Sequence, residues 1–209
     1  MATTPKTTLS ISSREDLNTA LEESLHGGNA PVALALSDLD GFGDVNRERG
    51  HEAGDEVLAL WEHTLLGNVP SDATVLRLGG DEYAAILPSL SVENALIVLD
   101  EIRGHFGLHV NEALGVTCSA SIGVAANPPH GTTVDALFQA AGQALMRAKR
   151  DGGDRTAIYV EEKMVLKSNY YSRANLERLA KLSAATNRTE ASLLRESLDD
   201  LIEKLRDKI

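Results

Sequence analysis

Apolar residues recur along the chain with two different spacings, which predict alternating helices and strands. Helical spacing marks four segments: one that begins with the Ser12-x-x-Glu15 capping box and ends at 27–28, and others at 57–66, 92–106 and 133–150. Short or alternating apolar runs mark five strands, at 31–36, 75–78, 83–87, 116–125 and 157–160. Because strands and helices interleave, with hairpins as well as crossovers, we expect an α/β fold in which helices cover a mixed or antiparallel sheet.

The pattern changes after residue 162. Residues 164–171 read as a short strand, and leucines then mark two helices, the second of which opens at Thr189. We therefore expect two domains, 1–162 and 163–209, the second being a small strand-helix-helix module. Charge changes at the same place, since 163–209 carry ten Lys or Arg against seven Asp or Glu, whereas 1–162 carry ten against twenty-four.

Composition excludes several classes of protein. The formal net charge is -11, so residues 1–162 do not bind nucleic acid through bulk charge, and a bound phosphate needs a local site such as a carboxylate-held metal. The single cysteine, Cys118, excludes an intramolecular disulfide framework and a zinc cluster. The glycine-rich motifs of dinucleotide-binding folds and Walker phosphate loops are missing. Neither an apolar run of about 20 residues nor a secretory signal is visible, so we expect a cytoplasmic protein without a membrane partner.

Acidic residues gather where the predicted strands end. Asp38 follows the first strand, and Asp81 and Glu82 occupy the tip of a hairpin between two others. A carboxylate at the end of a central strand loses hydration unless it has a partner. If these strands are neighbours, the oxygens suit Mg²⁺, and two such ions can activate a hydroxyl and stabilise a leaving phosphate oxygen. Taken alone, the sequence at 79–82 favours a polar turn with solvated acids.

The surrounding motifs resemble those of a known family. Residues 77–83, RLGGDEY, resemble the signature of GGDEF domains, the diguanylate cyclases, with Tyr83 in place of the final Phe. The segment 38–55 matches the family's D-x-D-x-F…N…G-H-x-x-G-D pattern, and 119–125 and 135–149 are similar to its later strand and helix. The resemblance covers roughly residues 10–160. It implies a largely antiparallel central sheet flanked by helices, as in palm-like nucleotidyl cyclases.

The resemblance implies a metal site and a reaction. Asp38 and Asp81 would bind Mg²⁺ together with the backbone carbonyl of Leu39, two ions per site, with Mn²⁺ as the alternative ion. Glu82 would be a further metal ligand or would help to deprotonate the attacking 3′-hydroxyl. Two GTP molecules, one in each subunit of a homodimer, would condense to cyclic di-GMP with release of pyrophosphate.

The same resemblance assigns nucleotide-binding residues. Asn46 and Asp55 would read the guanine edge, because an ionised Asp accepts from guanine N1–H and N2–H, a pair of donors that adenine lacks. The backbone N–H groups of Phe42 and Gly43 would hold the phosphates, and Lys149 would contact the terminal ones. The alternative for Lys149 is an exposed helix-end cation favoured by the helix dipole.

Three departures from the family pattern concern phosphate binding and regulation. Gly43 stands where Lys is usual and Gly153 where Arg is usual, so we expect weaker triphosphate binding rather than loss of chemistry. Pro70 and Ala73 replace the Arg and Asp of the family's product-inhibition site, so we expect no feedback inhibition through it. The alternative function is a catalytically weak nucleotide receptor that controls a DNA-binding C-terminal segment.

Residues 163–209 resemble a ribbon-helix-helix module. Such modules are obligate dimers, and in DNA-binding members their paired strands enter the major groove. We expect this segment to dimerise the chain, with DNA as a further partner if Arg188 meets a phosphate. A helical hairpin that only dimerises, with its basic residues solvated, is the simpler alternative.

Overall fold

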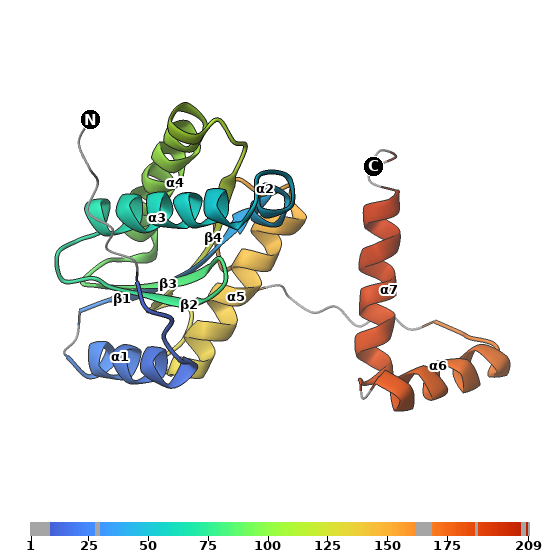
Figure 1. The fold of residues 1–209 in the computed structure, drawn as a ribbon. Helices are drawn as coiled ribbons and strands as arrows, with labels where there is room; N and C mark the ends of the chain where they lie inside the picture. Colours follow the sequence, from blue (N-terminus) through green and yellow to red (C-terminus); the bar gives the residue numbers. More distant parts are fainter. Residues whose placement is uncertain (1–8, 28–29, 162–168, 187, 206–207, 209) are drawn as a thin grey trace. The chain divides into compact units, whose positions relative to one another are not determined.

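The computed structural model describes residues 9–27, 30–161, 169–186, 188–205 and 208. The chain divides into two compact units, Met1–Glu161 and Glu162–Ile209. The second unit contains helices α6 (Arg173–Thr186) and α7 (Glu190–Lys204), and the first contains all other elements (Figure 1). Among the helices of the described residues, none combines the length and apolar character needed to cross a membrane.

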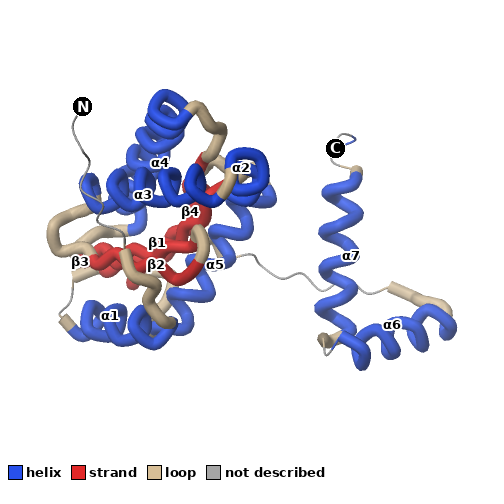
Figure 2. Tube along the Cα trace, in the orientation of Figure 1, coloured by secondary structure: helices blue, strands red, loops and turns tan. Residues whose placement is uncertain are grey.

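A five-stranded sheet with the order β2-β3-β1-β4-β5 forms the centre of the first unit (Figure 2). Its strands are β1 (Val32–Asp40), β2 (Thr74–Gly79), β3 (Glu82–Pro88), β4 (Ser119–Asn127) and β5 (Thr156–Ile158). Neighbouring strands are antiparallel, except that β4 and β5 are parallel. The expected mixed, largely antiparallel sheet is therefore confirmed.

Helices cover both faces of this sheet (Figure 1). One face is covered by α3 (His51–Asn68) and α4 (Val92–Leu114), and the other by α1 (Arg14–His26) and α5 (Val134–Arg150). Because side chains alternate along a strand, β1 sends Leu39 to the first face and Leu36 to the second. Asp38 and Asp40 follow Leu36 in this alternation and lie on the α1–α5 face at the end of the strand.

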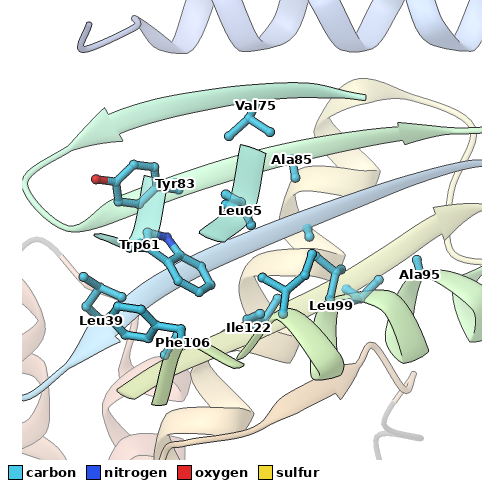
Figure 3. Packing of buried hydrophobic residues seen from close by; sticks show 14 of the residues in the cluster. Leu39, Trp61, Leu65, Val75, Tyr83, Ala85, Ala95, Leu99, Phe106 and Ile122 are labelled. Carbon is cyan, nitrogen blue, oxygen red and sulfur yellow. The ribbon is translucent and has the colours of Figure 1, made fainter. Parts of the chain in front are cut away.

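Three aromatic side chains meet in the core on the α3–α4 face. Trp61 of α3 is fully buried and packs edge to face against Phe106 of α4 and Tyr83 of β3, with ring centroids 5.0 and 6.5 Å away (Figure 3). Aromatic pairs in this geometry contribute about 0.5–1.5 kcal/mol beyond their buried area. Because Tyr83 directly follows the Gly-Gly-Asp-Glu turn, this cluster holds the turn end of the β2–β3 hairpin against α3 and α4.

The start of the first helix differs by one residue from the sequence prediction. Its N-cap is Ser13 rather than Ser12, and the capping box closes with Asp16 rather than Glu15. The Ser13 N–H donates to Asp16 Oδ2 at 2.6 Å, and the Asp16 N–H donates to Ser13 Oγ at 3.1 Å. The shorter Asp side chain therefore replaces the Glu of the usual motif.

Other element boundaries also change. β1 continues to Asp40 instead of ending before Asp38, because β4 pairs with it throughout. The apolar pattern misses α2 (Phe42–Arg49), in which the one buried side chain is Val45. Of the strand expected at 164–171, the last three residues form no strand, and the others lie outside the described residues.

Candidate active site

The strand order gathers the predicted acidic residues at one end of the sheet. β1 is flanked by β3 and β4, and Asp38 lies directly opposite Glu82 of β3 and Ser121 of β4. Asp81 lies in the turn between β2 and β3, next to Glu82. The strands that carry Asp38 and Glu82 are therefore neighbours, which is the condition that the predicted Mg²⁺ site requires.

Asp81 lies in an environment that opposes its negative charge. Partial burial raises the pKa of Asp81, and the negative charge of Asp38 raises it further, while Lys149 and Arg77 act in the opposite direction. Burial and a like charge both favour the neutral acid. A cation held between the two carboxylates would therefore stabilise their charged forms.

Lys149, in the last turn of α5, already places a positive charge beside these carboxylates. Its Nζ donates to Asp38 Oδ1 and lies 3.5 Å from Asp40 Oδ1. Burial alone would lower the pKa of Lys149, but the hydrogen bond and the negative charge of Asp38, aided by Asp40, raise it. Lys149 is thus a cation of the last turn of α5 that is 37% exposed and paired with Asp38.

The oxygen donors at this end of the sheet suit a hard divalent cation. Asp38 and Asp81 supply carboxylates, and Leu39 supplies a backbone carbonyl beside Asp38. Within the described residues, no three His, Cys, Asp or Glu side chains come close enough to hold a metal ion by themselves. A Mg²⁺ ion usually takes one or two carboxylates together with substrate phosphates, so this donor set fits such an ion.

Glu82 lies on the open side of the site. It is exposed and lines a groove of about 460 Å³ between α5 and strands β1, β2 and β3. Apolar side chains such as Leu36, Phe138 and Met146 form much of the same groove. Glu82 is therefore accessible to a second molecule that approaches the end of the sheet.

The two predicted guanine-reading residues lie on adjacent helices. Asn46 is on α2 and Asp55 is in the second turn of α3, and the two helices pack together. A Cβ atom on Gly54 would overlap the Asn46 side chain, so the glycine lets Asn46 lie against α3 next to Asp55. Asn46 is half-buried and Asp55 is exposed, which leaves the Asp55 carboxylate free to meet a base edge.

The predicted phosphate-binding amides open α2. The helix begins at Phe42 after Gly41, whose carbonyl accepts from the N–H groups of Asp44 and Val45 at 3.0 and 3.1 Å. The N–H groups of Phe42 and Gly43 precede these first bonds of the helix and are the kind that bind anions. A Cβ atom on Gly43 would meet nothing within 4 Å, so the missing Lys does not reflect lack of space.

A buried Glu62 network, which sequence reasoning misses, supports the hairpin. Glu62 of α3 is fully buried, accepts from the Tyr83 hydroxyl at 2.9 Å and from the Leu9 N–H at 2.8 Å, and pairs with Arg77 at 3.6 Å. Arg77 also donates twice to the Gly80 carbonyl, at 3.0 and 2.6 Å. Burial and the Glu62 hydrogen bond raise the pKa of Tyr83. The Tyr in place of Phe thus gives Glu62 a partner.

Asp40 is a second residue to which sequence reasoning assigns no role. It follows Asp38 by two positions on an extended strand, so both carboxylates lie on the same face. Asp40 accepts hydrogen bonds from Ser119 and Ser121 of β4 at 3.2 and 2.8 Å. The D-x-D spacing within a strand is the signal that places the two acids together.

A family model described as diguanylate cyclase, GGDEF domain, matches residues 10–155. The chain belongs to the GGDEF family. The match contains all the predicted site residues and confirms the resemblance carried by the sequence motifs. Diguanylate cyclases of this family use divalent metal ions, in agreement with the oxygen donors at the sheet end.

Two curated relatives of this GGDEF chain share about a third of the aligned residues. The response regulator PleD of Caulobacter vibrioides is 34% identical over 142 residues, which cover 65% of this chain and 31% of PleD. The diguanylate cyclase DgcP of Pseudomonas aeruginosa is 34% identical over 158 residues, which cover 71% of this chain and 23% of DgcP. The chain therefore spans less than a third of the length of either relative.

Solved GGDEF domains share the fold. The GGDEF domain of PA1120 (YfiN or TpbB) from Pseudomonas aeruginosa has a TM-score of 0.66 and 30% identity, covering 73% of this chain and 99% of that one. The active GGEEF domain of a diguanylate cyclase from Vibrio cholerae has a TM-score of 0.65 and 25% identity, covering 73% and 99%. Residues 163–209 lie beyond the family match.

Proposed function

We propose that this chain is a diguanylate cyclase that condenses two GTP molecules into one cyclic di-GMP and two pyrophosphates. The strongest support is the convergence of Asp38, Asp81 and Glu82 at one end of the sheet. Each 3′-oxygen attacks the α-phosphorus of the other nucleotide, and the bond from that phosphorus to the β-phosphate oxygen breaks. The 3′-hydroxyl proton passes to a carboxylate or to solvent, and pyrophosphate leaves.

The metal ligands in this proposal are Asp38, Asp81 and the Leu39 carbonyl, with two Mg²⁺ ions per site and Mn²⁺ as the alternative ion. Bound divalent ions lower the pKa of the attacking hydroxyl and neutralise charge on the leaving pyrophosphate. Glu82 is either a further ligand or the proton acceptor. Its exposure beside an open groove supports the second role, because the hydroxyl arrives from the other half of the dimer.

The nucleotide is held at both ends by residues of the first unit. Asn46 and Asp55 read the guanine edge, and the N–H groups of Phe42 and Gly43 bind phosphate oxygens. Lys149 exchanges its ion pair with Asp38 for the terminal phosphates when GTP arrives. We place this reaction in the cytoplasm.

A homodimer formed through residues 163–209 would bring two such sites together. An exposed apolar stripe at helical spacing is formed by Leu198, Leu201 and Ile202 of α7 and by Leu205 directly after it, which are 37% to 56% exposed. On α6, Leu176 and Leu182 are likewise 44% and 55% exposed. We propose that a second copy of the chain covers this stripe and raises the effective concentration of one site near the other.

DNA is the further partner proposed for residues 163–209, supported by their net positive charge and by the ribbon-helix-helix resemblance. Arg188, however, pairs with Glu196 at 2.7 Å and is thereby directed to α7. A salt-dependent mobility shift with duplex DNA tests this partner, because phosphate contacts weaken steeply as salt rises.

The cyclase is tested with purified protein, GTP and Mg²⁺ by measuring pyrophosphate and cyclic di-GMP together. We expect both products, with a loss of about 100-fold or more in Glu82→Gln. Glu101→Gln, which removes an exposed acid from α4, is the matched control and should retain activity. GTP binding without product at high protein concentration would favour the receptor, and adenine dinucleotides from mixed ATP and GTP would contradict the roles of Asn46 and Asp55.

A further inference from the structure

The two acids of the D-x-D segment have different surroundings. Both oxygens of Asp40 face protein donors: the Ser121 hydroxyl is shared between them at 2.8 and 3.0 Å, and Oδ2 also accepts from Ser119 Oγ at 3.2 Å and from the Asp154 N–H at 2.9 Å. With the Lys149 Nζ 3.5 Å from Oδ1, four donors face a carboxylate that offers about four lone-pair sites, so Asp40 has little capacity left for a ligand. Asp38 accepts a hydrogen bond from Lys149 and shares that ammonium with Asp40.

The hydrogen bond from Asp154 ties Asp40 to the turn that follows α5. The Gly153 N–H donates to the Ala148 carbonyl at 3.0 Å, and Gly152 donates to the Lys149 carbonyl at 3.1 Å, so this turn continues directly from the helix end. A Cβ atom on Gly153, which has φ +74°, would lie 3.1 Å from the Asp40 carboxyl group. A side chain at this position would therefore be strained and would push against the Asp40 carboxyl group.

Asp154 also shows that this turn is held under constraint. Its φ is +46°, a left-handed conformation that non-glycine residues adopt when their surroundings fix it. Its N–H is bound by Asp40 and its carboxylate pairs with Arg103 of α4 at 2.6 Å. The turn is therefore held by Asp40 of β1 and by Arg103 of α4, and it directly follows the last turn of α5, which contains Lys149.

We propose that Asp40 is a positioning residue that fixes the end of α5, and with it the Lys149 ammonium, at the Asp38 carboxylate. Asp38 is then the carboxylate that is available to a ligand, whereas Asp40 holds the turn after α5 in place. The inference rests on the proposed function, since Lys149 is expected to meet the GTP phosphates. It predicts that loss of Asp40 weakens GTP binding through Lys149 and not through the guanine or metal residues.

The test is a double-mutant cycle on the full chain, read as the affinity for a non-hydrolysable GTP analogue by calorimetry. Lys149→Met removes the charge, and Asp40→Asn leaves one accepting oxygen where two are used. We expect each single variant to weaken binding about tenfold, the effect of losing one charge-assisted contact. Because both act on the same contact, the double variant should be no weaker than Lys149→Met alone.

Ser121→Ala provides a second cycle if Asp40→Asn folds poorly, because it removes a hydroxyl donor to Asp40 and leaves every carboxylate in place. Ser121→Ala should also weaken binding of the GTP analogue, but only in protein that retains Lys149. Losses that add fully to those of Lys149→Met would overturn the positioning role. Failure of the wild-type protein to bind the analogue would instead overturn the proposed function.

Discussion

Asp81 lies where the fold disfavours its negative charge, because burial and the neighbouring Asp38 both raise its pKa. For an acid with a raised pKa, the stabilising contribution is complete below the unfolded-state pKa of 3.8 and is lost as pH rises through the folded-state value. We predict that Asp81→Asn raises the Tm at about pH 7 without metal, and that this gain disappears towards about pH 4. Thermal unfolding across this range measures it.

Mg²⁺ should reverse the order of the Tm values of the wild-type protein and Asp81→Asn, since a ligand that binds only the folded state raises its stability. Added Mg²⁺ is expected to raise the Tm of the wild-type protein at neutral pH and to leave that of Asp81→Asn unchanged. Asp72→Asn, an exposed acid in the turn before β2, is the matched control. A lower Tm for Asp81→Asn without metal at neutral pH would contradict the prediction.

Gly43 and Gly153 both stand where the family has a basic residue, but the structure leaves room only at Gly43. We predict that Gly43→Lys lowers the KM for GTP, most clearly at low salt, because a new cation near the phosphates is screened by ions. Gly153→Arg should instead destabilise the fold by about 1–2 kcal/mol, since φ is +74° and Asp40 is close. Kinetics at two ionic strengths and urea unfolding measure the two effects.

At the scale of single residues, the sequence predicts candidate site residues whose motif lies in neighbouring positions of the chain. Asp81 and Glu82 are found because a hairpin tip carries them, and the motif around Asp38 is contiguous. Asp40 is missed as a scaffold residue because its partners Ser119 and Ser121 are 79 and 81 positions away. Hydrogen bonds at such separations depend on strand register, which no local pattern contains.

Among the elements, α3 and the β2–β3 hairpin are joined by the fully buried Glu62. Glu62→Leu would leave Arg77, the Tyr83 hydroxyl and the Leu9 N–H without their partner. We predict a loss of about 3–5 kcal/mol, as when one member of a buried charged pair is removed. Tyr83→Phe keeps the ring and should cost only about 1 kcal/mol. Urea unfolding measures both, and equal midpoints for the two variants would contradict the network.

Element prediction succeeds where apolar runs are long or bounded by turn residues. The hairpin strands and α5 follow from such runs, and Thr133 caps α5 where the pattern begins. α2 is not found because it buries a single side chain and lies between two glycines, so tertiary packing on α3 stabilises it rather than its own pattern. β1 extends to Asp40 because it pairs with β4 up to that residue. The polar residues at the end of β1 do not by themselves predict a strand.

At the scale of the whole molecule, the proposed cyclase should differ in its regulation by product from relatives with an inhibition site. Pro70 and Ala73 occupy the positions of its Arg and Asp, and the Ala73 N–H donates to the Pro70 carbonyl at 3.0 Å in a tight turn that carries no basic residue. We predict that cyclic di-GMP inhibits only by competing with GTP. Initial rates at saturating GTP should therefore be unaffected by added product, and a fall in maximal rate would contradict this.

In the proposed dimer each site holds only one of the two nucleotides, so we predict that activity depends on protein concentration. A pair of charges on the α7 stripe, Leu198→Asp with Leu201→Asp, should oppose burial of this stripe and shift the protein to monomers. Specific activity should then fall at low concentration and recover as concentration rises, with sedimentation measuring the oligomer in parallel. Ser197→Asp, which adds the same charge beside the stripe, is the control and should remain active on dilution. If the double variant stayed equally active at every dilution, the two sites would have to meet through the first unit alone.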